Sequence, residues 1–376
     1  MILLEKLEIY GFEIKEILWM KSYLTERRQQ VYVDGSLSDP QDLQAGVPQG
    51  SILGPLLYII FTNDLPEVIH DHLSANNTFF NTSCKSCGSI CCFADDSTYS
   101  KSGKDVDKIK EDIQNKFQEI TIYMARNKLI LNSDKTHLLV MTSDKMHKKY
   151  DNFGINLDTG QEVIEPVEHE KLLGAQVSND FKFDIHIRNN KKSMINILTS
   201  RINALRKVAF VSSFKNRKMI AEGIIISKIL YIITLYGSCN DYLLSCLQIV
   251  QNSAARCVTR LSWNTAVSVL LQQCGWLSVR QMLFYHTMVQ VFKIKQDGKP
   301  VYLYNKLSQA FNYRTRLASS NGIRETEKIK SDLRKKGFVH RSTLQWNSLP
   351  LSLKNEKKQS KFKNDLRSWV KENVNT

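Results

Sequence analysis

Hydrophobic and polar residues alternate along the first sixty positions with spacings that predict a helix, a strand and a second helix. Residues 3–24 carry apolar side chains at helical spacing, whereas residues 29–33 alternate between apolar and polar as a strand does. A turn is expected at Asp34-Gly35, where the strand ends. After a loop that contains glycine and proline, an apolar helix is predicted to run from Ser51 toward Phe61.

Farther along the chain, residues 106–124 show apolar side chains at steps of three and four, which predicts an amphipathic helix. Two short strands are expected to follow it, at residues 129–131 and 137–141. A last amphipathic helix is predicted near residues 362–370.

These patterns divide the chain into three regions. Residues 1–177 mix strands with helices and indicate an α+β domain, residues 178–296 are almost entirely helical, and residues 297–376 are less regular and rich in lysine. The net charge is +15, and residues 291–376 carry 20 Lys and Arg against 7 Asp and Glu. Such an excess favours a polyanion, above all nucleic acid bound through its phosphates, although a solvated surface or an anionic membrane face has the same composition.

Neither a membrane span nor a secretory leader is expected. The longest apolar stretch, residues 224–236, is too short to cross a bilayer and is interrupted by Lys228, so it predicts a buried helix. Charged residues follow Met1 almost at once, which argues against a signal peptide. The chain contains 8 cysteines, which are then expected to be free thiols in a reducing compartment. We expect an intracellular protein, in either the nucleus or the cytoplasm.

The chemistry most strongly suggested by the sequence lies at Asp95 and Asp96. A short apolar run, residues 90–93, precedes them and residues 97–99 follow, which predicts a strand, a tight turn and a second strand. Adjacent carboxylates repel each other unless a cation neutralises them, and their hard oxygen atoms suit Mg²⁺. A pair of Mg²⁺ ions can stabilise the attacking and leaving oxygens of a phosphoryl transfer. A solvated surface turn would explain the same two residues on their own.

Three more segments surround the acid pair in a fixed order: residues 46–57 precede it, and Asn127–Thr136 and Lys171–Gly174 follow it. Together they resemble motifs of the reverse transcriptases of non-LTR (LINE-like, jockey-type) retrotransposons. The similarity covers essentially the whole chain, including Trp346–Pro350. It implies a right-hand polymerase, with partial fingers and a palm of antiparallel sheet and helices over residues 1–177. A helical thumb over residues 178–296 and a basic C-terminal region would follow.

The resemblance also implies roles for single residues. Asp95 and Asp96 would hold the Mg²⁺ that activates a primer 3′-hydroxyl, and Lys135 would contact or protonate the departing phosphates. The residues expected at the template or nucleotide are Pro48, Gln49, Gly50, Ser51, Arg27 and Arg28, and those expected at the primer grip are Leu173 and Gly174. The implied partners are an RNA template, a DNA primer and deoxynucleoside triphosphates, without a membrane.

Simpler explanations exist for several of these residues. Ser51 after Pro48 would cap a helix without any ligand, and Lys135 would be an exposed lysine in a turn. Arg27 and Arg28 would form a solvated pair.

A cysteine cluster departs from the simple family pattern. A CxxC pair, Cys84 and Cys87, is followed by Cys91 and Cys92, and two histidines at positions 70 and 72 precede it. Such ligands could bind structural Zn²⁺. However, a second CxxC is missing, and Cys91 and Cys92 would point to opposite faces of a strand, so free thiols are the simpler interpretation.

The helical region carries basic residues where a thumb would hold a nucleic-acid duplex. They are Lys191, Lys192, Arg201, Arg206, Lys207, Lys215, Arg217 and Lys218. Aromatic residues among the basic residues of the tail could stack on bases, but Trp346 and Trp369 are expected in the hydrophobic core.

The family pattern also includes a third catalytic carboxylate, in a Phe-Asp-x-Val motif that would precede Met1. Residues 2–11 are similar to the sequence that follows this motif. The resemblance therefore implies an N-terminally truncated reverse transcriptase with impaired turnover, since metal geometry depends on all the carboxylates. A non-catalytic nucleic-acid-binding remnant of a mobile element is the alternative, and a group II intron maturase fits less well.

Overall fold

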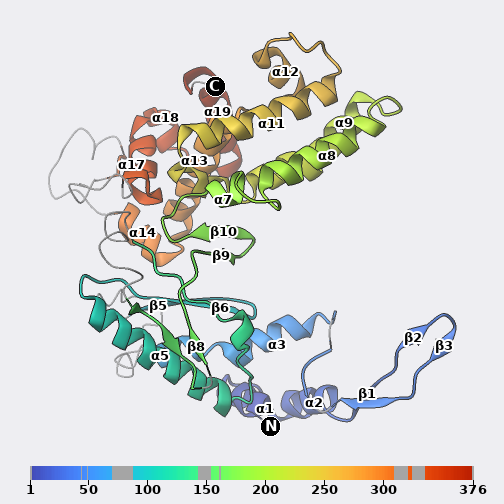
Figure 1. Cartoon of the computed structure of the whole chain (residues 1–376), viewed down its shortest axis with the longest axis vertical. Coiled ribbons are helices and arrows are strands. Elements are labelled where there is room, and N and C mark those ends of the chain that lie inside the picture. Colours follow the sequence, from blue (N-terminus) through green and yellow to red (C-terminus); the bar gives the residue numbers. More distant parts are fainter. Residues whose placement is uncertain are drawn as a thin grey trace. The chain divides into compact units, whose positions relative to one another are not determined.

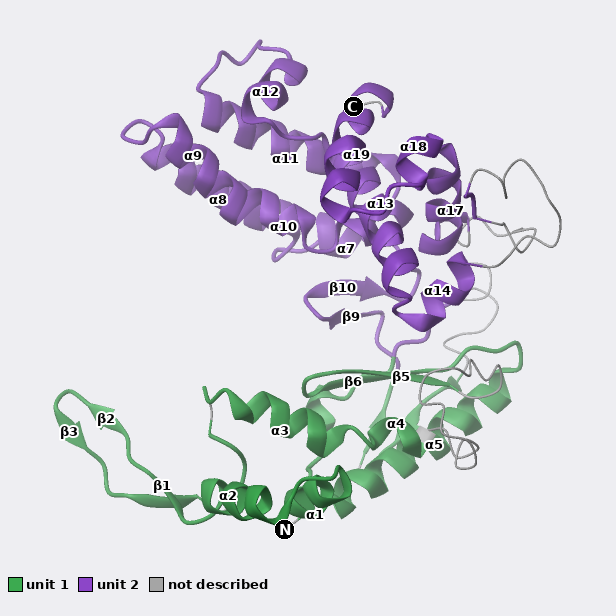
Figure 2. Ribbon diagram, turned by 180° about the vertical axis from the view of Figure 1, so that it is seen from behind, with its two compact units in different colours: residues 1–138, 153–165 green, residues 139–152, 166–376 purple. Residues whose placement is uncertain are grey.

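The structure, a computed structural model, describes residues 2–43, 45–48, 50–69, 88–142, 154–160, 162–308, 321–323 and 335–374. The chain forms two compact units, coloured green and purple in Figure 2. Unit 1 consists of residues 1–138 and 153–165, and unit 2 of residues 139–152 and 166–376. The described strands pair only as two-stranded antiparallel hairpins, so the chain is α+β, mostly helical, and shows no single palm sheet within these residues. The functional boundaries expected at residues 177 and 296 stay predictions.

Unit 1 combines short helices with small hairpins (Figure 1). Its described helices are α1 (Ile2–Ile9), α2 (Ile14–Leu24), α3 (Leu53–Thr62), α4 (Leu65–Ile69) and α5 (Val106–Arg126), with a 3-10 turn η1 (Ser133–Lys135). Its described strands pair as β1 (Arg27–Gln29) with β4 (Gln41–Leu43), β2 (Tyr32–Val33) with β3 (Ser36–Leu37), β5 (Ser89–Phe93) with β6 (Asp96–Ser100), and β7 (Leu157–Asp158) with β8 (Val163–Ile164).

The single helix expected over residues 3–24 is wrong, because the chain turns between α1 and α2. Gly11 has φ +87° there, a left-handed conformation that glycine adopts without strain. The turn lets α1 fold back on α2, so that Leu7, Leu24 and Leu57 form a small buried cluster. The strand expected over residues 29–33 is likewise two separate short strands, β1 and β2.

Helix α5 is confirmed, and it begins where the Asp105 side chain accepts a hydrogen bond from the backbone N–H of Lys108. The strands expected at residues 129–131 and 137–141 are wrong. The chain forms η1 between them, and the carbonyl of Asn132 accepts hydrogen bonds from Lys135 N and Thr136 Oγ1. Leu129 N, in the first expected strand, instead donates to the Met124 carbonyl at the end of α5, so this group is not available to a strand ladder.

A polar network inside unit 1 fixes α5 against α1 and the start of α4. The Lys6 ammonium, whose side chain is 12% exposed, lies 2.8 Å from Asp64 Oδ1. Tyr123 donates a hydrogen bond of 2.6 Å to the same oxygen. Because the Lys6 ammonium and the Tyr123 hydroxyl share one partly buried carboxylate, the spacing of the three helices is defined. Helix α4 in turn contacts strand β5 of the β5–β6 hairpin.

In its described residues, unit 2 is a helical body with one hairpin. The hairpin pairs β9 (His169–Leu172) with β10 (Ala175–Ser178). The described helices are α7 (Asp184–Ile187), α8 (Met194–Val208), α9 (Phe214–Ala221), α10 (Ser227–Leu230), α11 (Asp241–Thr259), α12 (Val267–Cys274), α13 (Val279–Asp297), α14 (Val301–Leu307), α17 (Phe338–Ser348), α18 (Leu351–Lys354) and α19 (Gln359–Asn373). A π-helical turn η3 (Glu222–Ile226) and a 3-10 helix η4 (Ile233–Ser238) interrupt the series.

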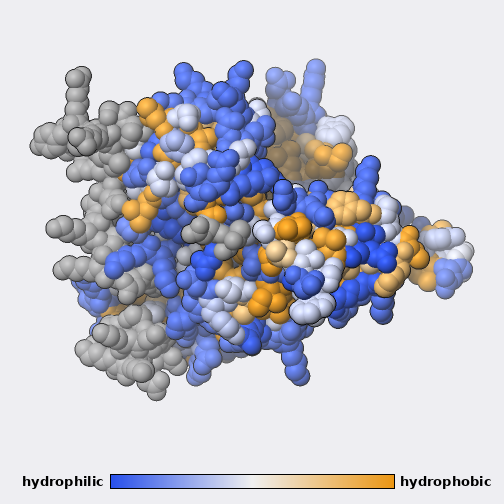
Figure 3. Space-filling model, turned by 90° about the horizontal axis from the view of Figure 1, so that it is seen from above, coloured by the Kyte–Doolittle hydropathy of each residue, from blue (hydrophilic) through white to orange (hydrophobic). Residues whose placement is uncertain are grey.

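One hydrophobic core runs through unit 2, from Phe183 to Val370. Trp346 is 1% exposed within it, as expected, and Trp369 packs against Phe284 with ring centroids 5.6 Å apart. Hydrophobic side chains also reach the surface in patches among hydrophilic ones (Figure 3). None of the described helices has the length and apolar character needed to cross a membrane.

Candidate functional site

The acid pair lies at the tip of the β5–β6 hairpin. Phe93 pairs with Asp96, so Ala94 and Asp95 form a two-residue turn, as the sequence predicted. Ala94 has φ +51°, which matches the first central position of a type II′ turn but is strained for a residue other than glycine. Both aspartates are exposed. The turn therefore presents two adjacent carboxylates to solvent on a backbone that the hairpin holds in an uncommon conformation.

Tyr58 on α3 lies near this turn. Burial raises the pKa of the Tyr58 phenol, and the negative charge of Asp95 raises it further, followed by that of Cys92. Asp95 is thus close enough to α3 for its charge to change the pKa of Tyr58. Among the described residues, no group of three or more His, Cys, Asp or Glu side chains is arranged to hold a metal ion.

The loop before α3 is closed by its own hydrogen bonds. Ser51 Oγ donates to the carbonyl of Pro48 at 2.8 Å and accepts from the backbone N–H of Gly54 at 3.0 Å. Ile52 is the N-cap of α3, but the Ser51 side chain satisfies one backbone N–H of the first turn without any ligand, much as the simpler explanation proposed. Gly50 has φ +79° with open space where a Cβ would stand, so backbone can be approached closely at this point. Gln49 lies outside the described residues.

Arg27 also stabilises this loop, through hydrogen bonds to its backbone. Its guanidinium donates to the carbonyls of Leu24, Ala45 and Gly46. Arg28 instead pairs with Asp42 at 2.8 Å, and both of these side chains are more than 70% exposed. The sequence predicted that both arginines contact the template. In the structure, Arg27 instead forms hydrogen bonds that stabilise the loop before α3, a role that the charge pattern does not indicate. A template contact by either stays a prediction.

Lys135 ends the 3-10 turn η1 and is exposed. Its ammonium makes no hydrogen bond or ion pair with another residue in the described part of the chain. It is therefore available to an anionic ligand.

The expected primer-grip residues lie in unit 2. Leu173 and Gly174 have φ +46° and +83° and form the two-residue turn of the β9–β10 hairpin. Positive φ at both positions is the type I′ geometry, in which Gly174 is unstrained and Leu173 is not. Tyr231 donates a 2.9 Å hydrogen bond to the Leu173 carbonyl and thereby holds the turn.

A buried histidine, to which the sequence assigned no role, connects this hairpin to the helices. His186 Nδ1 accepts a hydrogen bond from Gln176 N at 3.2 Å, and Nε2 lies 3.3 Å from the Tyr236 hydroxyl. The first bond requires a bare Nδ1, so the proton sits on Nε2. Burial lowers the pKa of His186, followed by the charge of Lys228, so the imidazole stays neutral.

The cysteine cluster is only partly described. Cys84, Cys87, His70 and His72 lie outside the described residues. Cys91 and Cys92 are exposed free thiols on β5, so Zn²⁺ binding stays a prediction.

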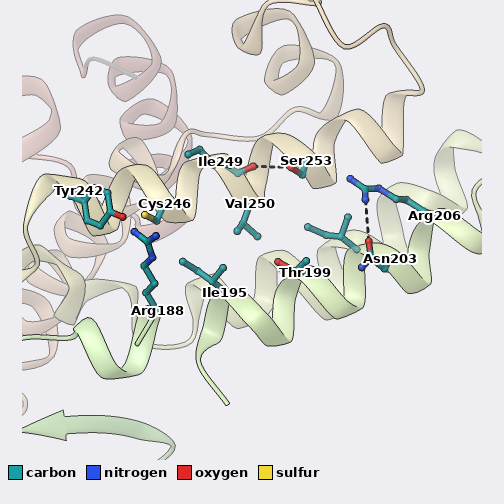
Figure 4. Close-up of a pocket in the computed structure, with 11 residues that line it drawn as sticks. Arg188, Ile195, Thr199, Asn203, Arg206, Tyr242, Cys246, Ile249, Val250 and Ser253 are labelled. Atoms are coloured by element: carbon teal, nitrogen blue, oxygen red, sulfur yellow. Dashed lines mark hydrogen bonds between the residues drawn. The ribbon is translucent and has the colours of Figure 1, made fainter. Parts of the chain in front are cut away.

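Helices α8 and α11 enclose a groove with a cavity volume of 390 Å³ (Figure 4). Arg188 lies at one end, 5.1 Å from the ring centroid of Tyr242. Arg206 lies at the other end and donates to Asn203 at 3.0 Å. Isoleucine and valine side chains line the space between them: Ile195, Ile202, Ile249 and Val250.

Arg217 is a correction to the predicted basic surface. It is 7% exposed and donates to the carbonyls of Val258, Ala209 and Ser212. A buried guanidinium needs such partners, and a sequence does not show which carbonyls lie within its reach.

Comparisons with known proteins bear on this geometry. Residues 3–177 match the family model "Reverse transcriptase (RNA-dependent DNA polymerase)". A probable RNA-directed DNA polymerase from transposon BS of Drosophila melanogaster is 62% identical over 47 residues, 12% of this chain and 5% of that protein. The polymerase from mobile element jockey of the same species is 53% identical over 49 residues, 13% of this chain and 5% of that protein.

A third relative is matched over a longer segment. The probable polymerase from transposon X-element of Drosophila melanogaster is 24% identical over 245 residues, 65% of this chain and 25% of that protein. The matched segments thus span a quarter or less of these relatives, and no solved structure matches the chain. The acid-pair hairpin and the Gly50 loop both lie inside residues 3–177. Residues 3–177 therefore match the reverse transcriptase family, and the chain is related over part of its length to the RNA-directed DNA polymerases of the jockey, BS and X-element mobile elements.

Proposed function

We propose that this chain carries the nucleotidyl-transfer site of an RNA-directed DNA polymerase of a non-LTR retrotransposon. The observation that carries the proposal is the exposed Asp95–Asp96 pair at a strained hairpin tip, inside the segment that matches the family. In the reaction a primer 3′-oxygen attacks the α-phosphorus of a deoxynucleoside triphosphate, a new P–O bond forms, and pyrophosphate leaves.

Asp95 and Asp96 fit the Mg²⁺ that enzymes of this family generally use. Their oxygens are hard ligands, and neither carboxylate is paired with another residue in the described ranges. Mg²⁺ is usually held by one or two protein carboxylates, while substrate phosphates and water complete its shell. When bound, the metal would lower the pKa of the attacking hydroxyl and neutralise charge on the leaving group.

The surrounding residues would position the other reactants. The Gly50 backbone would approach the nascent base pair, with Pro48, Gln49 and Ser51 shaping the template side. Lys135 would contact the departing pyrophosphate, to which it offers three N–H donors. In unit 2, the turn at Leu173 and Gly174 would support the primer end. In this proposal unit 1 supplies palm and fingers elements, and the helices of unit 2 act as the thumb.

Primer extension on poly(rA)/oligo(dT) with Mg²⁺ and dTTP tests the proposal. We expect the full chain to extend the primer slowly, and Asp95→Asn to lower the rate further by roughly a hundredfold or more, because one metal ligand becomes neutral. Asp39→Asn is the matched control, since Asp39 is also exposed but lies outside the hairpin. Equal rates for Asp95→Asn and the control would refute the assignment.

A second candidate is a nucleic-acid-binding protein without polymerase activity, which the net charge of +15 favours. The same assay separates the two. Binding of the primer–template without any extension, at several Mg²⁺ concentrations, would support the second candidate and reject the first.

A further inference from the structure

The end of unit 2 where α8 passes into α9 and α11 into α12 has an unusual composition. We call residues 207–215 and 260–263 the unit 2 tip. No Asp or Glu occurs between Asp184 and Glu222, nor between Asp241 and Asp297. Both segments of the tip therefore lie in stretches of sequence without acidic residues. Lys207, Lys215 and Arg260 contribute exposed cations. A surface without acids and with several cations attracts polyanions.

Large apolar side chains project from the same tip. Phe210 is 77% exposed, Val211 88% and Trp263 84%. The Arg260 guanidinium lies over one face of the Phe210 ring, 4.9 Å from its centroid. Trp263 follows only three residues later, within about 10 Å of Arg260 by chain length. Phe210 thus has a cation over one face of its ring, and Trp263 is an exposed aromatic residue on the same segment as that cation.

The tip is held in place from inside. Buried Arg217 on α9 donates to Val258 O near the end of α11 at 2.8 Å and to Ala209 O after α8 at 3.3 Å. Ser213 caps α9 by accepting from Asn216 N at 3.2 Å. Because one guanidinium connects three helix ends, Phe210 and Arg260 keep their relative position without a ligand. A preorganised surface loses less entropy on binding.

We propose that the unit 2 tip binds single-stranded nucleic acid, with unpaired bases stacked on Phe210 and Trp263 and phosphates bound by Lys207, Lys215 and Arg260. Unpaired bases offer flat faces to aromatic rings, whereas a duplex covers those faces and leaves only its phosphates accessible. The Arg260–Phe210 contact favours this ligand over a lipid surface, because a charged guanidinium over one face of the ring hinders the ring's insertion among acyl chains. The α8–α11 groove is not part of this site, because its central lining is aliphatic and its two arginines, Arg188 and Arg206, already contact Tyr242 and Asn203. The proposal does not depend on polymerase activity in unit 1.

The test measures binding by the full chain, in EDTA and without nucleotides, of a fluorescein-labelled oligothymidylate and of a blunt DNA duplex of the same length. Phe210→Ala and Trp263→Ala are each expected to weaken oligothymidylate binding about tenfold and to leave duplex binding unchanged. Lys215→Ala is expected to weaken both and to lower the slope of log affinity against log salt by about 1. Tyr302→Ala, which removes a 63% exposed aromatic elsewhere in unit 2, is the matched control and should change neither.

Several results would overturn the proposal. One is oligothymidylate affinity unchanged by both aromatic variants, and another is an equal loss in Tyr302→Ala. Loss of duplex binding in parallel would also contradict it, because stacking would then not be the cause. Binding of phosphatidylserine vesicles that depends on Phe210 and Trp263, without a matching effect on the oligonucleotide, would assign the tip to membranes instead. The thermal unfolding temperature of each variant is compared with that of the unmodified chain to establish that the fold is intact. No change is expected, because the substituted side chains are exposed.

Discussion

In unit 2, the Arg341 side chain leaves no room for a residue larger than glycine at position 237. A Cβ at position 237 would overlap the Arg341 guanidinium, which donates to Thr234 O at 2.6 Å and is therefore not free to move away. We expect Gly237→Ala to lower the free energy of unfolding by about 1–3 kcal/mol, as overpacking does. Gly223→Ala, where a Cβ meets nothing within 4 Å, should raise it by about 0.5–1 kcal/mol. Urea unfolding measures both, and equal effects would contradict this explanation.

His186 predicts a pH dependence at the same scale. Because burial lowers its pKa in the folded state, the unfolded state binds the proton more readily. The His186 contribution to stability is therefore complete above about pH 6.5 and is lost as the pH falls below that value, by at most about 1.4 kcal/mol per pH unit.

The matched variant is His186→Asn, whose side-chain oxygen can still accept from Gln176 N but cannot titrate. Its unfolding free energy, measured between pH 7 and pH 5, is expected to fall less steeply than that of the unmodified chain. His286 also has a pKa lowered by burial and by nearby Arg367 and Lys363, so part of the slope should persist. Identical slopes would show that His186 is not the titrating group.

At the scale of elements, a long periodic pattern of apolar residues was enough to predict a helix, whereas a short alternating pattern was not enough to predict a strand. Residues 106–124 and 362–370 were recognisable as helices because many apolar positions recur, and α5 has a capping Asp105. The strands expected around η1 are absent because a few alternating residues do not outweigh local hydrogen bonds, such as that from Leu129 N to the Met124 carbonyl at the end of α5. The acid-pair turn was predictable from its flanking strands. The roles of Arg27 and Arg217 were not, since they depend on carbonyls brought close by the fold.

Arg27 gives the prediction for an element, the loop at residues 45–50. We expect Arg27→Ala to destabilise the loop by about 1–3 kcal/mol, because carbonyls of Ala45 and Gly46 lose a charged donor. Hydrogen exchange in this loop should accelerate accordingly. Arg28→Ala removes only an exposed ion pair with Asp42 and should change stability by less than about 1 kcal/mol. Equal exchange rates in both variants would contradict the assigned role.

At the scale of the molecule, the two units have separate hydrophobic cores of very different extent. We expect two unfolding transitions, with unit 1 unfolding first because its cluster contains few buried residues. Leu57→Ala should lower the first transition and Leu247→Ala the second, each by about 2–5 kcal/mol, since both side chains are at most 1% exposed. A single transition shifted equally by both variants, followed by circular dichroism, would show that the cores unfold together.

The central claim is that Asp95 and Asp96 bind the divalent metal of a polymerase site. It can be measured without turnover by replacing Mg²⁺ with Fe²⁺, adding ascorbate and peroxide, and mapping where hydroxyl radicals cleave the protein backbone. Our account predicts cleavage beside Asp95 and Asp96 that excess Mg²⁺ suppresses and that Asp95→Asn abolishes, while Asp39→Asn leaves it intact. Cleavage elsewhere only, or cleavage at the hairpin that persists in Asp95→Asn, would contradict the claim.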